Sequence, residues 1–120
     1  MIVLPHTSLT GFSSVKIGVI FSKQDWNSTG VRALDEAVDM MNKRADILPH
    51  RRLIYSPIFS DDNTFTLTRA VCSGIGAGFR AVIGPSSYLP SLHVQSICHG
   101  LDIPHLDTTV GNNIFKLTNY

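Results

Sequence analysis

The sequence has little of what marks a membrane-spanning segment, a nucleic-acid partner or a disulfide-stabilised scaffold. Its 120 residues include two cysteines, and its apolar runs are far shorter than the ~20 residues of a membrane-spanning helix. Ten basic and nine acidic residues give a net charge of +1, without the concentrated basic face that binding to nucleic acid requires. We therefore expect no nucleic-acid partner and no direct membrane contact.

Motifs for catalysis, metal binding and cofactor binding are also missing. No serine stands in a G-x-S-x-G motif, and no H-E-x-x-H, C-x-x-C or EF-hand spacing occurs. His93 and His99 are not spaced to share one face of a helix. Gly74, Gly76 and Gly78 end a predicted helix instead of following a strand, so they indicate a helix stop and not a dinucleotide site. We expect no enzyme activity, no cofactor and no metal.

The N-terminal residues 1–14 lack the basic leader and the apolar stretch of a secretory signal peptide. We expect this segment to be irregular and a single domain to follow over residues 15–120. Either the chain is cytosolic, or sequence that precedes Met1 in the natural protein is missing.

Strand and helix patterns alternate along that domain. Strands are predicted at residues 15–21, 53–59, 81–83, 103–106 and 115–120, and helices at about 31–44, after the cap cluster 61–64, and from about Pro90. This alternation predicts an α/β fold, an open parallel sheet with helices on both faces in three αβα layers. With the strand order 2-1-3-4-5, the first helix lies on one face and the other two lie together on the opposite face. Pro57 predicts an edge position for the second strand.

Polar residues follow two neighbouring strands of this sheet. Ser86 and Ser87 follow the third strand, and Thr108 follows the fourth. In open α/β sheets ligands bind at the carboxyl ends of the strands, so these hydroxyls are candidate ligand contacts. The alternative is that the serines cap the third helix. Separately, Asn27 begins an Asn-Ser-Thr glycosylation motif in a predicted loop.

Phe65 is the candidate contact residue on the second helix. It stands two residues before Leu67, and Leu67, Val71 and Ile75 form the apolar stripe of that helix. Phe65 lies off this stripe, so we expect its ring to point outward, where aromatic side chains are typical anchors of protein interfaces.

Several segments together resemble a known family, the amino-terminal domains of ionotropic glutamate receptors, and in particular the kainate class. The segments that carry the resemblance are Ile17–Phe21, Ala37-Val38-Asp39 with Asn42 and Leu48-Pro49, Ala70–Cys72, Ala81–Ser87, Val94–Cys98 and Ile103–Leu106.

The resemblance implies a periplasmic-binding-protein type I-like lobe, the first of a two-lobed extracellular module whose second lobe would follow Tyr120. It implies subunit assembly with other glutamate receptor subunits, as a homodimer or a heterodimer through the second and third helices, and a place on the extracellular side of the plasma membrane. Aromatic residues that match Phe65 pack against the partner lobe in that class. The alternative function is an amino-acid-binding lobe, since related receptors use a serine and a threonine that match Ser86 or Ser87 and Thr108.

A third alternative is a cytosolic flavodoxin-like domain, although no glycine stands in the loop after the first strand. The resemblance also implies that Cys72 pairs with a cysteine of a later loop, which this chain does not contain. Cys98 lies on an apolar stripe, and we predict no disulfide between Cys72 and Cys98. Because the first helix alone covers its face of the sheet, we expect that face to stay partly exposed.

Overall fold

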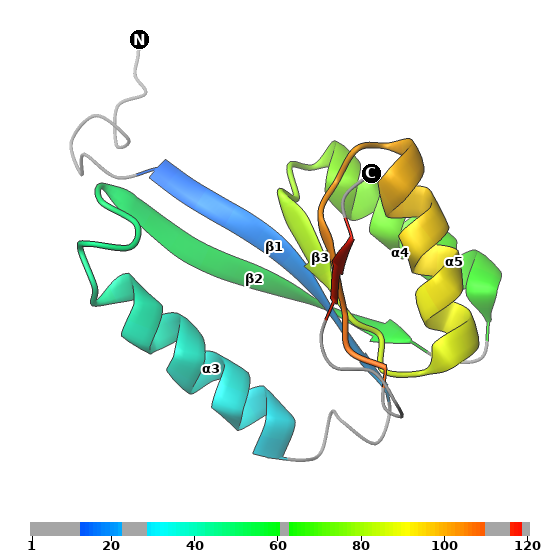
Figure 1. Cartoon of the computed structure of the whole chain (residues 1–120), viewed down its shortest axis with the longest axis horizontal. Coiled ribbons are helices and arrows are strands. Elements are labelled where there is room, and N and C mark those ends of the chain that lie inside the picture. Colours follow the sequence, from blue (N-terminus) through cyan, green and yellow to red (C-terminus); the bar gives the residue numbers. More distant parts are fainter. Residues whose placement is uncertain (1–12, 23–28, 61–62, 110–115, 119–120) are drawn as a thin grey trace, which may run out of the picture.

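The computed structural model describes residues 13–22, 29–60, 63–109 and 116–118. Strands and helices alternate along these ranges (Figure 1). In chain order the elements are β1 (Ser13–Ser22), α3 (Thr29–Asn42), β2 (Arg51–Ser60), α4 (Thr64–Gly76), β3 (Ala81–Ile83), α5 (Tyr88–Gly100), β4 (His105–Asp107) and β5 (Lys116–Thr118). The first strand therefore begins inside the segment 1–14 that we expected to be irregular, and residues 1–12 lie outside the described ranges.

The sheet has the strand order β2-β1-β3-β4-β5, as the sequence predicts. β1 and β2 pair in parallel along their whole length, from Ser13 opposite Arg51 to Ser22 opposite Ser60. β1 also pairs in parallel with β3, and β3 with β4. The fold is thus the predicted α/β type, with the long strands β1 and β2 extending beyond the short strands β3 and β4.

β5 departs from the expected parallel arrangement. It runs antiparallel to β4, with His105 opposite Thr118 and Asp107 opposite Lys116. Only residues 108–115 connect the two strands, whereas a parallel neighbour needs a crossover of about a dozen residues or more. The expectation of a fifth parallel strand was wrong for this reason, and the sheet is mixed at this edge.

The outer edge of β2 is closed by a side chain of α3. The Asn42 amide donates to the Leu53 carbonyl oxygen at 2.9 Å, and the Leu53 amide donates to Asn42 Oδ1 at 2.7 Å. Asn42 therefore pairs with this strand as a further strand would. Pro57, which shares the outward direction of Leu53 by strand alternation, has no N–H to offer. Both features discourage another strand from pairing here, which is how exposed sheet edges are commonly protected.

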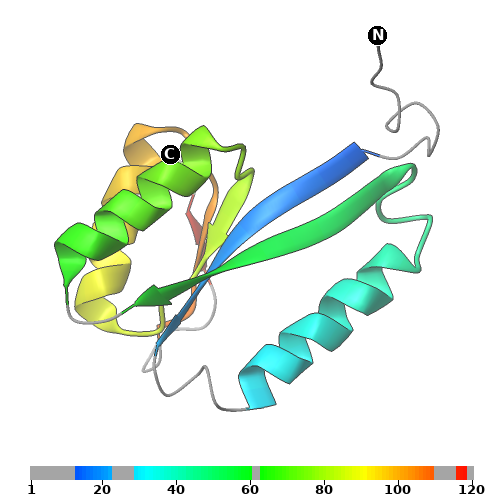
Figure 2. The same cartoon turned by 180° about the vertical axis from the view of Figure 1, so that it is seen from behind.

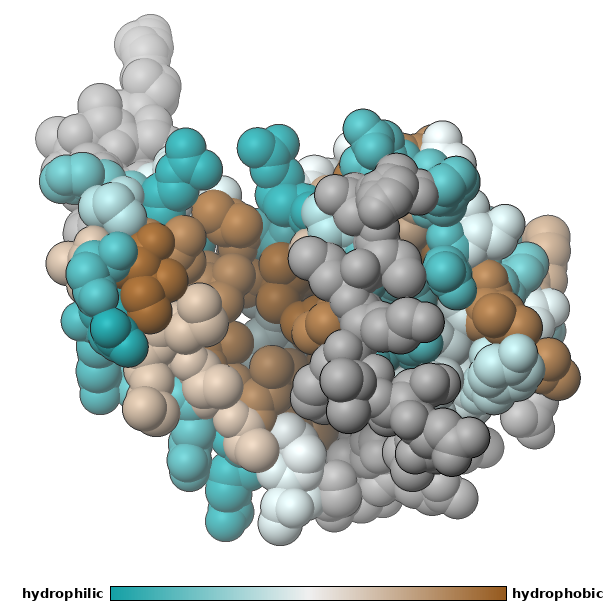
Figure 3. All heavy atoms as spheres, in the orientation of Figure 1, coloured by the Kyte–Doolittle hydropathy of each residue, from teal (hydrophilic) through white to brown (hydrophobic). Residues whose placement is uncertain are grey.

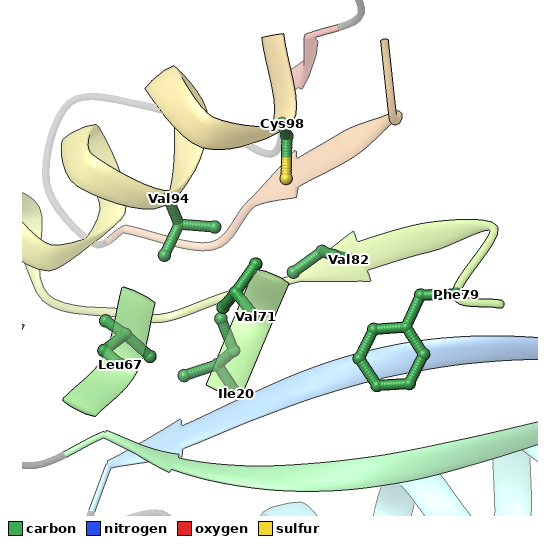
Figure 4. Close-up of a cluster of buried hydrophobic side chains, with 7 residues drawn as sticks. All are labelled: Ile20, Leu67, Val71, Phe79, Val82, Val94 and Cys98. Atoms are coloured by element: carbon green, nitrogen blue, oxygen red, sulfur yellow. The ribbon is translucent and has the colours of Figure 1, made fainter. Parts of the chain in front are cut away.

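The helices form two layers around the sheet, with α3 on one face and α4 and α5 side by side on the other (Figures 1 and 2). The core lies between the sheet and the α4–α5 layer. Its buried residues are Ile20, Leu67, Val71, Phe79, Val82, Val94 and Cys98. Figure 4 shows these side chains, which come from β1, β3, both helices and the turn after α4. The predicted stripe of α4 is confirmed, since Leu67 and Val71 are fully buried.

The Phe79 ring occupies space that two glycines leave open. A Cβ atom on Gly18 would lie 2.4 Å from the ring, and a Cβ on Gly74 would lie 2.0 Å from it. α4 continues through Gly74 and ends at Gly76, so the predicted helix stop falls at the last two of the three glycines. Gly78 has a φ of +114°, and the Phe79 amide donates back to the Gly74 carbonyl at 3.0 Å.

The α3 face of the sheet is only partly covered. No residue of α3 is fully buried, and its apolar stripe is half-buried. That stripe consists of Val31, Leu34, Val38 and Met41. Phe59 of β2 remains 51% exposed. Figure 3 shows apolar side chains gathered in a hollow beside α3, in agreement with the expected exposure of this face.

Candidate functional site

Two regions hold the residues that the sequence singles out. The first is the outward side of α4 and α5, which we call the α4–α5 surface. Because α4 directs Leu67 and Val71 toward the sheet, Phe65 points away from it and is 67% exposed, as predicted. The other large apolar side chains exposed on these helices are Tyr88, Leu89 and Leu92.

The start of α4 holds Phe65 in place. The Asn63 side chain caps the helix, and its Oδ1 accepts from the Phe65 and Thr66 amides at 3.0 and 3.2 Å. The Arg69 guanidinium, one turn later, lies 5.8 Å from the centre of the Phe65 ring, within the range of a cation–π contact. The surface therefore presents an apolar ring and a cation as one unit.

A hydrogen bond joins α4 to α5 at this surface. The Thr68 hydroxyl donates to the Thr64 carbonyl at 2.7 Å, so its single proton is already used. Thr68 Oγ1 also contacts His93 Nε2, and this nitrogen must then be the donor. This bond joins the N-terminal half of α4, which carries Phe65, to the N-terminal half of α5, which carries Leu89.

The two cysteines have different environments. Cys72 of α4 is exposed and Cys98 of α5 is buried, and neither forms a disulfide, in agreement with the prediction for this pair. Burial raises the pKa of the Cys98 thiol to about 11, with a smaller contribution from nearby Cys72. The pairing of Cys72 with a later cysteine stays a prediction.

The second region lies at the carboxyl ends of β3 and β4. The two strands meet there, since the Gly84 amide donates to the Leu106 carbonyl at 3.0 Å. Ser86 and Thr108 each follow two residues later, so the structure places them on adjacent connections, and both are half-buried. Gly84 has a φ of +86°, and a Cβ there would lie 2.6 Å from the Ile20 carbonyl oxygen, so this turn requires glycine.

Ser87 precedes α5 without capping it through its side chain. It occupies the N-cap position, yet its hydroxyl makes no capping hydrogen bond. Ser87 is exposed at this edge of the sheet. The alternative prediction, that the serines serve to cap the third helix, is therefore wrong for the Ser87 hydroxyl.

Asp107 organises this edge, although it is not among the site residues predicted from the sequence. Its Oδ1 accepts from Ser91 Oγ and from the Thr109 amide, each at 2.9 Å. Partial burial alone would raise the pKa of Asp107, but the hydrogen bonds from Thr109 and Ser91 together hold it below the usual range. Asp107 thereby fixes the connection that carries Thr108 against α5. An acidic residue at the end of a strand, followed by two threonines, was the available sequence indication.

His105 belongs to the framework of the same edge. It is buried at 1% exposure, and its Nε2 donates to the Gly84 carbonyl at 2.8 Å, which ties β4 to the turn after β3. Within the described ranges, no group of three or more His, Cys, Asp or Glu side chains converges in the way that a metal ion requires.

A groove of about 290 Å³ separates α3 from β2. Several of its polar groups already have partners. The Tyr55 hydroxyl donates to Asp35 at 2.5 Å, and this bond, with partial burial, raises the pKa of Tyr55 to about 12. Asp39 pairs with Lys43 at 3.0 Å along the helix. We therefore interpret the groove as the packing boundary between α3 and the sheet, which we call the seam, and not as a ligand site. Asn27, the candidate glycosylation site, lies outside the described residues.

Comparison with known families decides what kind of domain this is. Residues 30–118 match the family described as the receptor family ligand binding region. The chain belongs to this family. A receptor ligand-binding region is not an enzyme family, and the match covers α3 through β5.

Relatives of this receptor-family chain include kainate receptors. It is 30% identical over 109 residues to "Glutamate receptor ionotropic, kainate 1" of Mus musculus and of Rattus norvegicus. The match covers 88% of this chain but only 13% and 11% of these two relatives. The resemblance to the kainate class, inferred from the sequence motifs, is thereby confirmed over the residues that match these relatives.

The fold of the receptor-family chain also occurs in a bacterial protein. An ABC transporter substrate-binding protein from Desulfitobacterium hafniense superimposes with a TM-score of 0.69 at 20% identity, over 78% of this chain and 28% of that one. At this identity the likeness establishes a periplasmic-binding-protein-like fold and nothing about ligands. Among the described residues no helix has the length and apolarity to span a membrane.

Proposed function

We propose that the chain is the first lobe of the extracellular amino-terminal domain of a glutamate-gated channel subunit, and that it serves subunit assembly through the α4–α5 surface. The observation that carries this proposal is the exposure of Phe65, which is 67% exposed on a well-capped helix. The kainate relatives, which are named glutamate receptors, support the context. The whole receptor's activity does not follow from a match to 13% of its length.

The composition of the α4–α5 surface supports an interface. Leu89 is 71% exposed and Leu92 is 44% exposed on α5, the helix that lies beside α4 with its exposed Phe65 (Figures 1 and 2). Large apolar side chains grouped on ordered helices are costly to leave in water, and such groups commonly mark protein contacts. The C-terminal halves of the helices carry small exposed residues, such as Ser73 and Ser96, which let a partner approach closely.

Extracellular placement is part of this proposal. It is supported by the glycosylation motif at Asn27 and by the receptor family. Expressed in a secretory host, the chain should lose mass when an amidase removes N-linked glycans, and the Asn27→Gln chain should not. A secreted chain without any mass loss would contradict the glycan at Asn27.

The alternative function is an amino-acid-binding lobe. It is favoured by the exposed Ser87 hydroxyl, which does not cap α5, and by the connection with Thr108 that Asp107 holds in place. Titration calorimetry with glutamate and other amino acids tests it. Heat of binding that Ser87→Ala and Thr108→Val both reduce would support binding at this edge, and binding unchanged in both variants would place the ligand elsewhere.

The assembly role is tested by sedimentation of the wild-type chain and of Phe65→Ala. Each is analysed alone and with the amino-terminal region of mouse kainate 1, at high salt to screen charge. Loss of an anchoring aromatic commonly costs ~2 kcal/mol or more, or roughly 30-fold in affinity. Met40→Ala, which changes a side chain of α3 that is 66% exposed, is the control and should have no effect.

If neither mixture associates, the assembly role is contradicted. An association that Phe65→Ala leaves unchanged would place the contact on another surface. An unfolded Phe65→Ala chain would show that the ring belongs to the core, contrary to its exposure.

A further inference from the structure

The α4–α5 surface carries positive charge and no carboxylate of its own. Neither Thr64–Gly76 nor Tyr88–Gly100 contains an aspartate or a glutamate. The exposed ionisable side chains that can be positive are Arg69 on α4, and His93 and His99 on α5. The ion pairs Lys43–Asp39 and Arg44–Asp46 lie on or beside α3, away from this surface.

Four carboxylates are close to these helices in sequence, Asp61, Asp62, Asp102 and Asp107. Asp61 and Asp62 precede α4 and lie outside the described residues. Asp102 is exposed beyond the C-terminal end of α5, far along the helix from Phe65. Asp107 is bound by Ser91 and Thr109 at the sheet edge. No carboxylate therefore comes from the two helices that build the surface.

Two-fold pairing would place this surface against itself. In such a pair each copy presents the same patch, so the Arg69 guanidinium of one copy faces a surface whose two helices supply a second Arg69 and no carboxylate. Bringing like charges together in a partly desolvated contact is unfavourable. The carboxylates of α3 lie on the opposite face of the sheet and do not enter a closed two-fold contact (Figures 1 and 2).

We infer that the α4–α5 surface fits a different protein chain, one whose contact face is apolar at its centre and carries a carboxylate opposite Arg69. This inference rests on the proposed assembly function and names the partner for it. The Phe65 ring holds the Arg69 guanidinium 5.8 Å from its centre. A guanidinium held in this way can donate two parallel hydrogen bonds to one carboxylate, a geometry that adds both strength and specificity.

A charge-reversed copy of this chain serves as the probe, since it supplies the missing carboxylate on an otherwise identical surface. Wild type, Arg69→Glu and their equimolar mixture are compared by sedimentation at about 50 mM salt. We expect the mixed pair to form about tenfold more tightly than either matched pair, and the difference to shrink as salt is raised to about 0.5 M. Arg32→Glu makes the same charge change on α3 and should show no preference for wild type.

Ser96→Glu places a carboxylate on α5 instead, at another exposed position of the surface. It should also prefer wild type to itself, and it replaces Arg69→Glu if that variant does not fold. If wild type pairs with itself as tightly as with either variant, the inference is overturned while the interface stands. A tighter wild-type pair would indicate that Asp61 or Asp62 of a second copy meets Arg69, which also overturns it. Absence of association in every mixture at both salt concentrations would instead overturn the assembly function.

Discussion

On the face of the sheet that α4 and α5 cover, seven apolar side chains form one buried cluster (Figure 4). On the other face, none of the α3 residues is fully buried, and the Phe59 side chain of β2 is 51% exposed. Both faces are apolar in sequence, because Ile17–Phe21 of β1 is a continuous apolar run. The difference comes from the helices, since two adjacent helices can bury side chains between them and against the sheet, whereas one helix leaves its flanks open. We therefore expect the α4–α5 side to contribute most of the free energy of unfolding.

The largest effect should come from a matched pair of leucines. Leu67→Ala in α4 removes a side chain that is 1% exposed, and it should cost about 2–5 kcal/mol of unfolding free energy. Leu34→Ala in α3 removes a half-buried side chain and should cost about 1 kcal/mol. Urea unfolding followed by circular dichroism measures both. Equal losses would mean that the α3 face is as well packed as the other.

The next effect concerns glycines within α4. Gly74→Ala would place a Cβ atom 2.0 Å from the Phe79 ring, and the resulting shift should cost about 1–3 kcal/mol. Gly76→Ala is the control, because nothing lies within 4 Å of a Cβ there. It should be neutral or stabilising by up to about 1 kcal/mol. A harmless Gly74→Ala chain would show that Phe79 moves freely and that the core is loosely packed.

Much of this architecture could be predicted from the sequence, because it depends on local patterns. Alternating apolar runs indicate the strands and helices, and a proline in β2 indicates an edge. The direction of β5 was missed although the sequence indicates it, since the connection 108–115 is too short for the crossover that a parallel neighbour needs. Two contacts between distant residues were also missed. Asn42 pairs with Leu53, and Ser91 with Asp107, and such pairs form only once the helices pack beside the strands.

On the α4–α5 surface, the sequence predicted the exposed Phe65 but not the interactions around it. Phe65 lies off an apolar stripe, and this periodicity alone indicates that it points outward. The stacking of Arg69 on the ring and the bond between Thr68 and His93 need the helix positions. Strand order predicts that Ser86, Ser87 and Thr108 lie at one edge of the sheet. That the Ser87 hydroxyl does not cap α5, and that Asp107 accepts from the Thr109 amide, could be seen only in the structure.

The reactivities of the two thiols test which sides of α4 and α5 are buried and which are exposed. Cys72 should react rapidly with a thiol reagent in the native chain, and Cys98 only when the chain opens. The pKa of Cys98 is raised to about 11 from 9.0, so the unfolded chain loses this proton first. The stability that Cys98 contributes is therefore present below about pH 9 and is lost as the pH rises to about 11. Two thiols of equal reactivity, or none, would contradict this assignment.

The smallest effect should come from the seam between α3 and β2, where Tyr55 donates to Asp35 at 2.5 Å. Tyr55→Phe removes one exposed hydrogen bond and should cost about 0.5–1.5 kcal/mol, less than Leu67→Ala. The bond raises the pKa of Tyr55 from 10.0 to about 12, because the phenolate would face a carboxylate. Its contribution is thus complete below about pH 10 and disappears as the pH rises through about 12. Absorbance at alkaline pH, compared between wild type and Tyr55→Phe, isolates the titration of this phenol from those of the other two tyrosines. In the Asp35→Asn chain the phenol should titrate nearer to 10, with a similar small loss of stability. If Tyr55 titrates normally in wild type, or if Tyr55→Phe destabilises the chain as much as Leu67→Ala, then α3 is held to the sheet differently, and the contrast between the two faces is smaller than their burial indicates.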